Sequence, residues 1–367
     1  MLRNRRAVSL ALWLCSLNFL LQATMTPAQA RAGEEPPKVV VEADGTVEVP
    51  AQTVPMSSFL SPEAKAYMTQ HLKDMQDPEI LKQDAGVPRF MKPYLERDHA
   101  QFAVERKDEK VGGVHVYVYT PKSGVSAKNK DRVLINLHGG GFSGCWPACA
   151  ELESIPVSAL GQIEVISVDY REGPDYKFPA ASEDVASVYQ EALKTHQPKN
   201  IGIYGCSAGG ILTAMSVAWF QTHSLPKPGA VGIFCASAGG VFGGDALYTA
   251  GPLGEARMAP PAPPTPSQTP PLSYLSGTNP KDPLVAPVNS PEVLAKFPPT
   301  LMITGTRGFE LSAALYTHEQ LVKAGVDADL HVWEGLFHGF FYNADVPESR
   351  DALNVIVKFF DRHLGRE

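Results

Sequence analysis

The sequence predicts an α/β fold in which a mostly parallel sheet is covered by helices on both faces. Short apolar segments of strand character alternate with segments of helical spacing along most of the 367 residues, a pattern typical of parallel sheets. A Gly-X-Ser-X-Gly motif joins one such strand to a helix, and a run of three glycines directly follows another. In this fold class, loops that follow the strands carry the functional groups.

Eight segments are expected to form the strands, because each is short and carries apolar or alternating residues. They are residues 101–106, 114–120, 133–137, 163–168, 201–204, 231–235, 301–304 and 330–333. Helical spacing covers residues 58–99, 180–195, 208–221, 312–324 and 351–363. Residues 245–297 break the alternation and include a proline-dense run at 259–271. We interpret this stretch as an excursion over one edge of the sheet rather than a separate domain.

The first 30 residues are interpreted as a signal peptide. A basic head with three arginines precedes an apolar run at 7–21, and Ala28-Gln29-Ala30 supplies small residues for cleavage. An uncleaved membrane anchor is the alternative, although such a helix needs about 20 apolar residues. We therefore expect a periplasmic or secreted protein with no stable membrane span after cleavage. Residues 31–57, rich in Pro, Glu and Val, are expected to form a poorly ordered leader.

The charge balance excludes one class of partner. Removal of residues 1–30 takes away three arginines and no acid, so the net charge changes from −7 to −10. Because phosphate contacts need basic patches, an acidic chain without a Lys/Arg tract is not expected to bind nucleic acid. The composition is close to the globular mean, which excludes fully disordered and fibrous classes.

Four cysteines remain after the signal segment. Cys145 and Cys149 are four residues apart in one loop, and in an oxidising compartment they can close a small ring. Cys206 and Cys235 end predicted strands and are expected to be inert buried thiols. No clustered Cys/His spacing typical of zinc ligands occurs, so a zinc site has little support.

Ser207 is the candidate nucleophile. It lies in Gly205-Cys206-Ser207-Ala208-Gly209-Gly210, directly after a predicted strand and before a predicted helix. A serine at such a sharp turn projects its hydroxyl above the sheet edge, and the flanking glycines leave room for the tight backbone. The alternative is a Gly/Ser-rich packing turn without chemistry.

A glycine loop, His138-Gly139-Gly140-Gly141-Phe142, follows the strand predicted at 133–137. Bare glycine N–H groups can approach a ligand closely, and an acyl-transfer enzyme uses such groups to stabilise the oxyanion of its tetrahedral intermediate. A flexible loop is the structural alternative. A phosphate-binding loop is excluded because no Gly-Lys-Ser/Thr follows the glycines.

A serine needs a base to take its proton, and His338 is the best placed of ten histidines. It follows the last predicted strand and precedes the last helix, where a loop can carry an imidazole over the carboxyl ends of the strands. His115 and His331 lie on strands and are expected to be structural. Surface roles are expected for the histidines on helices or helix ends, which are His71, His196, His223, His318 and His363.

These motifs together resemble the hormone-sensitive-lipase-like branch of the α/β-hydrolase superfamily. The resemblance covers about residues 100–365 and includes the glycine loop, the Ser207 turn and the C-terminal loop around His338. Further matching segments are Tyr170-Arg171, Phe178-Pro179-Ala180-Ala181, Asp184, Asp282-Pro283-Leu284 and Ser290-Pro291. The resemblance implies an eight-stranded, mostly parallel sheet, carboxylester hydrolysis without metal or cofactor, and a helical cap from residues 58–99 and 245–297 on a domain spanning 58–367.

Carried over residue by residue, the resemblance makes Ser207 the nucleophile and His338 the base. It also implies that the N–H groups of Gly140, Gly141 and Ala208 form the oxyanion hole.

The sequence departs from the family pattern at two positions. Cys206 stands where the family usually has Asp, which we expect to alter local hydrogen bonding only. Gly308 stands where the triad Asp is expected. Three accounts of the second departure are open. Glu310, two residues on, can reach His338 with its longer side chain; the chain can be a variant that lost its acid; or the protein can be a non-catalytic relative.

We therefore predict an exported serine carboxylesterase that hydrolyses small-molecule esters with short or medium acyl chains, with Ser207, His338 and Glu310 as catalytic residues. Two alternatives from other classes are a non-catalytic hydrolase relative that binds a ligand, and an exported interaction module. Peptidase action is possible on the same fold, but the glycine loop favours esters. The oligomeric state is left open.

Overall fold

The computed structural model describes residues 38–80, 82–84, 86–240, 243–256 and 273–366, and the chain divides into two units at Val54. The described part of the first unit contains one antiparallel pair, β1 (Val40–Val41) and β2 (Val47–Glu48). The predicted signal peptide lies outside the described residues. Among the described residues, no helix is both long and apolar enough to cross a membrane.

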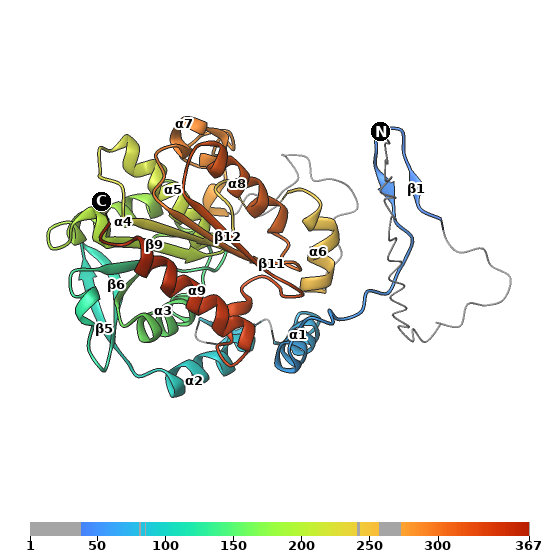
Figure 1. Cartoon of the computed structure of the whole chain (residues 1–367), viewed down its shortest axis with the longest axis horizontal. Helices are drawn as coiled ribbons and strands as arrows, with labels where there is room; N and C mark the ends of the chain where they lie inside the picture. Colours follow the sequence, from blue (N-terminus) through green and yellow to red (C-terminus); the bar gives the residue numbers. More distant parts are fainter. Residues whose placement is uncertain (1–37, 81, 85, 241–242, 257–272, 367) are drawn as a thin grey trace, which may run out of the picture. The chain divides into compact units, whose positions relative to one another are not determined.

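The second unit, residues 55–367, is built on an eight-stranded sheet (Figure 1). In spatial order the strands are β12 (Ala328–Trp333), β11 (Thr300–Gly305), β10 (Ala230–Phe234), β9 (Ile201–Cys206), β7 (Val133–Leu137), β8 (Glu164–Val168), β6 (Val114–Pro121) and β5 (Val104–Val111). Only β6 runs against its neighbours; the other described pairings within this sheet are parallel. The α/β fold and the mostly parallel sheet expected from the sequence are confirmed.

Helices cover both faces of this sheet, as the strand composition requires (Figure 1). One face carries α3 (Ala148–Gly161) and α9 (Pro347–His363), which pack on each other. The opposite face carries α4 (Ala180–Ala192), α5 (Ala208–Thr222) and α8 (Leu311–Lys323). The sheet is thus the central layer of three.

Strand side chains alternate between two apolar cores. In β9, Ile201 and Ile203 are buried in the core beneath α5, whereas Tyr204 and Cys206 are buried in the core beneath α3 and α9. Because successive side chains of a strand point to opposite faces, a strand covered on both sides must be apolar throughout. This double burial explains why the central strands appear in the sequence as continuous apolar runs.

Two sequence-based expectations about elements were wrong. The edge strand expected at 101–106 is β5 (Val104–Val111), because residues 105–110 are exposed and charged and carry no apolar signal. Helix α3 was not predicted at all. It contains Pro156 and is buried along nearly all of its length, so it shows no amphipathic stripe.

The region expected to form the cap contains several short elements. Residues 58–99 fold into α1 (Pro62–Asp74), a strand pair β3 (Gln83–Asp84) and β4 (Val87–Pro88), and α2 (Lys92–Gln101). The excursion at 245–297 contributes α6 (Ala246–Glu255) and α7 (Pro291–Leu294). Helices α1 and α6 pack on each other. The proline-dense run at 259–271 lies outside the described residues.

Candidate active site

Ser207 occupies the sharp turn between β9 and α5. Its backbone is left-handed, with φ 57° and ψ −120°, a conformation that costs a non-glycine residue about 1–3 kcal/mol. The neighbouring glycines are required sterically, because a Cβ at Gly205 or Gly209 would collide with the carbonyl oxygen of Leu137. The predicted strand–turn–helix context is confirmed, and strain is kept at the residue expected to react.

The glycine loop lies beside this turn. Gly140 and Gly141 have φ values of 116° and 67°, and a Cβ at Gly140 would collide with the backbone of Gly144. Among the described residues, no protein acceptor takes the N–H groups of Gly140, Gly141 or Ala208. Gly140 and Gly141 line the same cavity as Ser207, so their free N–H groups are available to a bound molecule.

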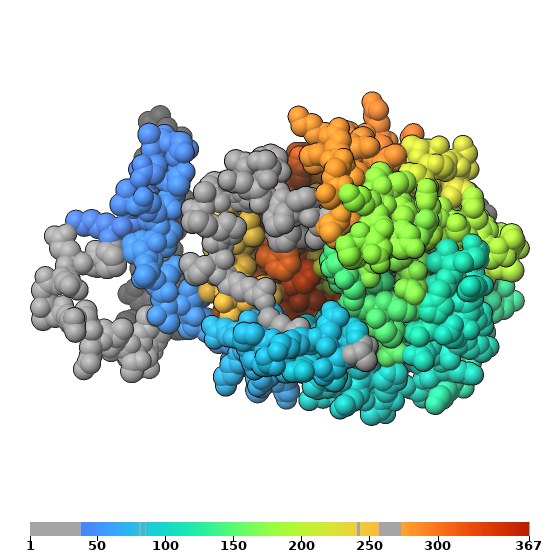
Figure 2. Space-filling view, turned by 180° about the vertical axis from the view of Figure 1, so that it is seen from behind, coloured from blue at the N-terminus to red at the C-terminus, as the bar shows by residue number. Residues whose placement is uncertain are grey.

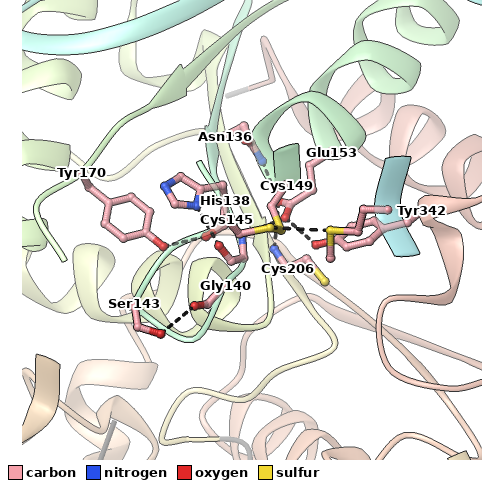
Figure 3. Close-up of a disulfide and its surroundings, with 12 residues drawn as sticks. Asn136, His138, Gly140, Ser143, Cys145, Cys149, Glu153, Tyr170, Cys206 and Tyr342 are labelled. Atoms are coloured by element: carbon pink, nitrogen blue, oxygen red, sulfur yellow. Dashed lines mark hydrogen bonds between the residues drawn. A yellow bond between two sulfur atoms is a disulfide. The ribbon is translucent and has the colours of Figure 1, made fainter. Parts of the chain in front are cut away.

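A disulfide closes the end of this loop. Cys145 and Cys149 are bonded, with Cα atoms 5.5 Å apart, which is the small ring that their spacing in the sequence allows (Figure 3). A Cβ at Gly140 would also come within 2.7 Å of the Cys145 Cβ. The crosslink therefore packs directly against the glycine loop.

His338 and Glu310 form a hydrogen-bonded pair. The His338 Nδ1 lies 3.0 Å from the Glu310 Oε2, and the Thr304 hydroxyl donates to the other carboxylate oxygen at 2.8 Å. Glu310 is fully buried. It is the N-cap residue of α8, just beyond β11, whereas His338 lies in the loop between β12 and α9. The sequence had left three accounts open here, and the structure places Glu310 at the imidazole.

Gly308 has a steric relation to this carboxylate. A Cβ built at Gly308 would lie 2.5 Å from the Glu310 Oε1 and 2.9 Å from its Oε2. No real Cβ tolerates such contacts, so a side chain at position 308 would displace the Glu310 carboxylate. The glycine where the resemblance implied an Asp thus leaves the space that the glutamate fills.

The electrostatics of the pair favour an imidazolium next to a carboxylate. Burial alone would lower the pKa of His338, but the charge of Glu310 and its hydrogen bond raise that pKa to about 9. Burial alone would raise the pKa of Glu310, but the charge and hydrogen bond of His338 lower it below its usual value. Glu310 therefore stays ionised and stabilises a proton on His338.

A buried carboxylate that the sequence reasoning missed connects several segments of the site. Glu153 of α3 accepts hydrogen bonds from Asn136 Nδ2 and Tyr342 Oη at 2.8 Å, from Gly139 N at 2.8 Å and from Cys206 N at 3.2 Å (Figure 3). Burial raises the pKa of Glu153 to about 7, although the four hydrogen-bond donors lower it. One side chain thus ties the glycine loop, the residue before Ser207 and the segment after His338 together.

His138 supports the glycine loop from below. Its ring stacks on Tyr170, with centroids 4.3 Å apart, and its Nδ1 lies 2.7 Å from the Gly139 carbonyl oxygen. Burial lowers its pKa to about 4, so the ring is neutral at physiological pH. Its assignment to the loop rather than to proton transfer fits this fully buried position.

A cavity of about 280 Å³ opens onto these residues. Ser207, His338, Gly140 and Gly141 line one part of it. The cap side of the wall is formed mainly by apolar and aromatic residues, among them Tyr67, Met75, Pro88, Phe90, Met91 and Tyr94. Figure 2 shows a hollow between the light-blue to cyan segment and the yellow one, with orange-to-red chain at its floor. The predicted nucleophile, base and glycine loop thus face one cavity.

Two further residues of this wall were missed or misplaced by sequence reasoning. His71 was expected at the surface, but it is 6% exposed and lines the cavity, because α1 is covered by α6. Glu255, the last residue of α6, lines the same cavity and drew no attention in the sequence. No local motif marks either residue, since their proximity depends on cap packing.

The two free cysteines are buried, as expected. Cys235 Sγ accepts a hydrogen bond from Gly339 N at 3.3 Å. Its sulfur also lies within 4.8 Å of ligand atoms of Glu310 and His338, a grouping that could hold a metal ion. Glu310 and His338 are already hydrogen-bonded to each other in this grouping.

Comparison with known proteins defines the class to which this architecture belongs. A family model described as the alpha/beta hydrolase fold matches residues 134–342, more than half of the chain. The crystal structure of an esterase superposes with a TM-score of 0.73 at 28% identity, covering 86% of this chain and 98% of that one. The chain therefore belongs to the α/β-hydrolase family.

Curated relatives refine the class. An acetyl-hydrolase of Streptomyces hygroscopicus is 26% identical over 249 residues, which are 65% of this chain and 78% of that protein. An esterase of Acinetobacter venetianus is 27% identical over 240 residues, covering 62% and 74%. A solved esterase of the bacterial hormone-sensitive lipase family, 23% identical, shares the fold with a TM-score of 0.68 and covers 83% of this chain and 99% of that one. The expected class of carboxylic ester hydrolase is confirmed, and the chain is a carboxylic ester hydrolase of the α/β-hydrolase family.

Proposed function

We propose that this protein is an exported serine carboxylesterase that hydrolyses small esters with short or medium acyl chains. The observation that carries the proposal is the Glu310–His338 hydrogen bond at a cavity that Ser207 also lines. A serine that shares a cavity with an imidazole bound to a buried carboxylate is the arrangement that can activate a serine hydroxyl. The esterase and acetyl-hydrolase names of the relatives agree with this chemistry.

In the proposed mechanism, Ser207 Oγ attacks the ester carbonyl carbon while His338, in its neutral form, takes the hydroxyl proton. The carbonyl oxygen becomes an oxyanion, which the unpaired N–H groups of Gly140, Gly141 and Ala208 stabilise. His338 then donates its proton to the leaving alcohol, and the acyl group stays on Ser207. Water, deprotonated by the same imidazole, releases the acid and restores the serine. Glu310 holds the imidazole and stabilises its charged form throughout.

The cavity supports the assignment to small esters. At about 280 Å³ it lies at the lower end of small-molecule sites, and most of its cap side is apolar. Such a space fits a short acyl chain or a compact alcohol group.

Export is proposed from the basic, apolar and small-residue pattern of residues 1–30. The Cys145–Cys149 disulfide supports it, because disulfides persist in oxidising compartments. Fractionation of expressing cells, with N-terminal sequencing of the mature chain, tests this point. A mature chain that starts near Arg31 outside the cytoplasm supports export, and an intact Met1 terminus in the cytoplasm contradicts it.

Hydrolysis of p-nitrophenyl acetate and butyrate by the mature chain tests the catalytic proposal, with Ser207→Ala as the control. We expect turnover by the wild type and a loss of at least about 10³-fold in the variant. Equal rates would contradict the proposal. Saturable binding of the esters without turnover, and without fluorophosphonate labelling of Ser207, would favour the non-catalytic relative.

A further inference from the structure

Two polar side chains on the cap side of the cavity have no role in the ester chemistry above. His71 of α1 stacks on Phe337, the neighbour of His338, with ring centroids 3.5 Å apart. Glu255 ends α6 on the same wall. The His71 Nε2 and the Glu255 Oε2 are 3.8 Å apart, which is too long for a hydrogen bond.

Both side chains carry a buried polar atom without a partner. Among the described residues, the His71 Nε2 and the Glu255 Oε1 are each shielded from solvent and make no hydrogen bond. Most buried polar groups in folded proteins are hydrogen-bonded, and an unpaired one is costly. Since both atoms belong to residues that line the substrate cavity, a bound molecule is the natural partner for them.

The charge of Glu255 extends over the reaction centre. Among the described residues that line the cavity, it is the single acidic side chain. Burial is the main cause of the raised pKa of Tyr67, and the Glu255 charge adds to it. For His338, where burial lowers the pKa and Glu310 raises it, the Glu255 charge also contributes to the rise. The carboxylate therefore acts electrostatically on both the cap wall and the base.

The surrounding wall suits a positive charge. Tyr67, Phe90, Tyr94 and Phe337 line the same cavity, and the Phe337 ring stacks on His71. Aromatic faces attract cations, and the attraction strengthens where water is excluded. The unprotonated nitrogen of an imidazole and a carboxylate oxygen are both acceptors, and a primary ammonium group has three donors. One ammonium group can thus satisfy both unpaired atoms at once.

We propose that His71 and Glu255 form a specificity site for esters that carry a protonated amine in the part of the molecule that lies against the cap. This inference rests on the proposed esterase function and names the substrate class of that site. Ser207 and His338 carry out the hydrolysis, whereas Glu255 selects the substrate by charge and His71 completes the acceptor pair.

Three aryl acetates of nearly equal shape test the inference. They are 4-(aminomethyl)phenyl acetate, which is cationic at pH 7, 4-(hydroxymethyl)phenyl acetate, a neutral donor, and 4-ethylphenyl acetate, which is apolar. Release of the phenol gives kcat/KM for each. We expect the cationic ester to exceed the ethyl ester by about tenfold or more, the gain expected of a charge-assisted hydrogen bond at a partly solvated wall. Equal values, or a hydroxymethyl ester as good as the aminomethyl one, would overturn the inference.

Two variants locate the effect. Glu255→Gln removes the charge at nearly constant shape, and we expect the ratio of cationic to ethyl ester to fall to about one. Glu319→Gln removes the same charge from an exposed position on α8 and should keep the wild-type ratio. A ratio that survives Glu255→Gln would overturn the inference.

Binding to Ser207→Ala separates the inference from the proposed function. Calorimetry should give a Kd for benzylammonium chloride about tenfold below that for benzyl alcohol, with the difference lost when Glu255→Gln is added. This result would support the site even if none of the three esters were hydrolysed. Hydrolysis of all three at equal rates, with equal binding of both probes, would reject the site and leave the esterase function intact.

Discussion

Replacement of Glu310 by Gln is the perturbation that most directly probes the catalytic pair. The amide is nearly the same size as the carboxylate and can still accept the Thr304 hydroxyl bond. It cannot supply the negative charge that faces the His338 Nδ1 at 3.0 Å. Packing of the buried site is therefore largely kept, while the electrostatic contribution is removed.

The size of the effect follows from the pKa of His338. Glu310 raises that pKa, against the effect of burial, from 6.5 to about 9. At a pH above 9, where the wild-type imidazole is neutral, a rise of this size corresponds to about 3 kcal/mol of stabilisation of the imidazolium, or about 300-fold in rate if all of it is lost. The wrong imidazole tautomer adds to this loss, and removal of the triad acid in a serine protease costs about 10⁴-fold. We expect kcat to be reduced by a factor that lies between these two values.

Steady-state hydrolysis of p-nitrophenyl butyrate gives kcat and KM for the wild type and the variant. KM should change little, because the cavity wall is intact, so the loss appears in kcat. Glu319→Gln on the exposed face of α8 is the control and should keep wild-type kcat. A Glu310→Gln enzyme that retains more than a third of the wild-type kcat would refute the reasoning.

Position 308 provides an independent check on the same claim. Because its Cβ would lie 2.5 Å from the Glu310 Oε1, Gly308→Asp alone should lower kcat rather than raise it. In a Glu310→Ala background the space is free. Adding Gly308→Asp there should raise kcat at least about tenfold above that of Glu310→Ala, because it supplies a new acid. A large gain from Gly308→Asp alone would show that the wild type lacks an acid.

Three further predictions concern the site's electrostatics and its support. The base His338 must be neutral to act, and Glu310 raises its pKa, so kcat/KM should fall as pH decreases through a pKa above 6.5. In Glu310→Gln, the pH–rate profile should show this fall at a lower pH. Glu153→Gln places an amide donor among four donors, so the free energy of unfolding measured in urea should fall by about 2–4 kcal/mol and kcat should also fall. The control Glu191→Gln, at the surface of α4, should change neither quantity. Replacement of Cys145 and Cys149 by Ala should cost about 2 kcal/mol, the entropy of a short loop, with a fall in kcat through the glycine loop; unchanged unfolding curves would contradict the crosslink.

The sequence could predict the parts of the site that depend on local chain geometry. Ser207 and the glycine loop follow directly from strands whose apolar runs are continuous, because both faces of the sheet are covered. His338 could be selected by its place between the last strand and the last helix. The fold class rests on the same alternation, and the family match agrees with it.

The remaining parts depend on packing between distant segments, which no local pattern encodes. From the sequence, Glu310 as the acid was one of three explanations for the glycine at position 308. Whether Glu310 reaches His338, 28 residues away, depends on the space that Gly308 leaves. Glu153 lies on a buried helix without amphipathic spacing, so neither the helix nor its carboxylate gave a signal. His71 seemed a surface residue because the covering helix α6 comes from another part of the chain.

Fluorophosphonate labelling followed by mass spectrometry tests the central claim, that His338 and Glu310 activate Ser207, most directly. The account predicts one adduct per chain, on Ser207, in the wild type, with a labelling rate at least about 100-fold lower in Glu310→Gln and no adduct in Ser207→Ala. Labelling of Ser207 at the same rate in the wild type and in Glu310→Gln would contradict it.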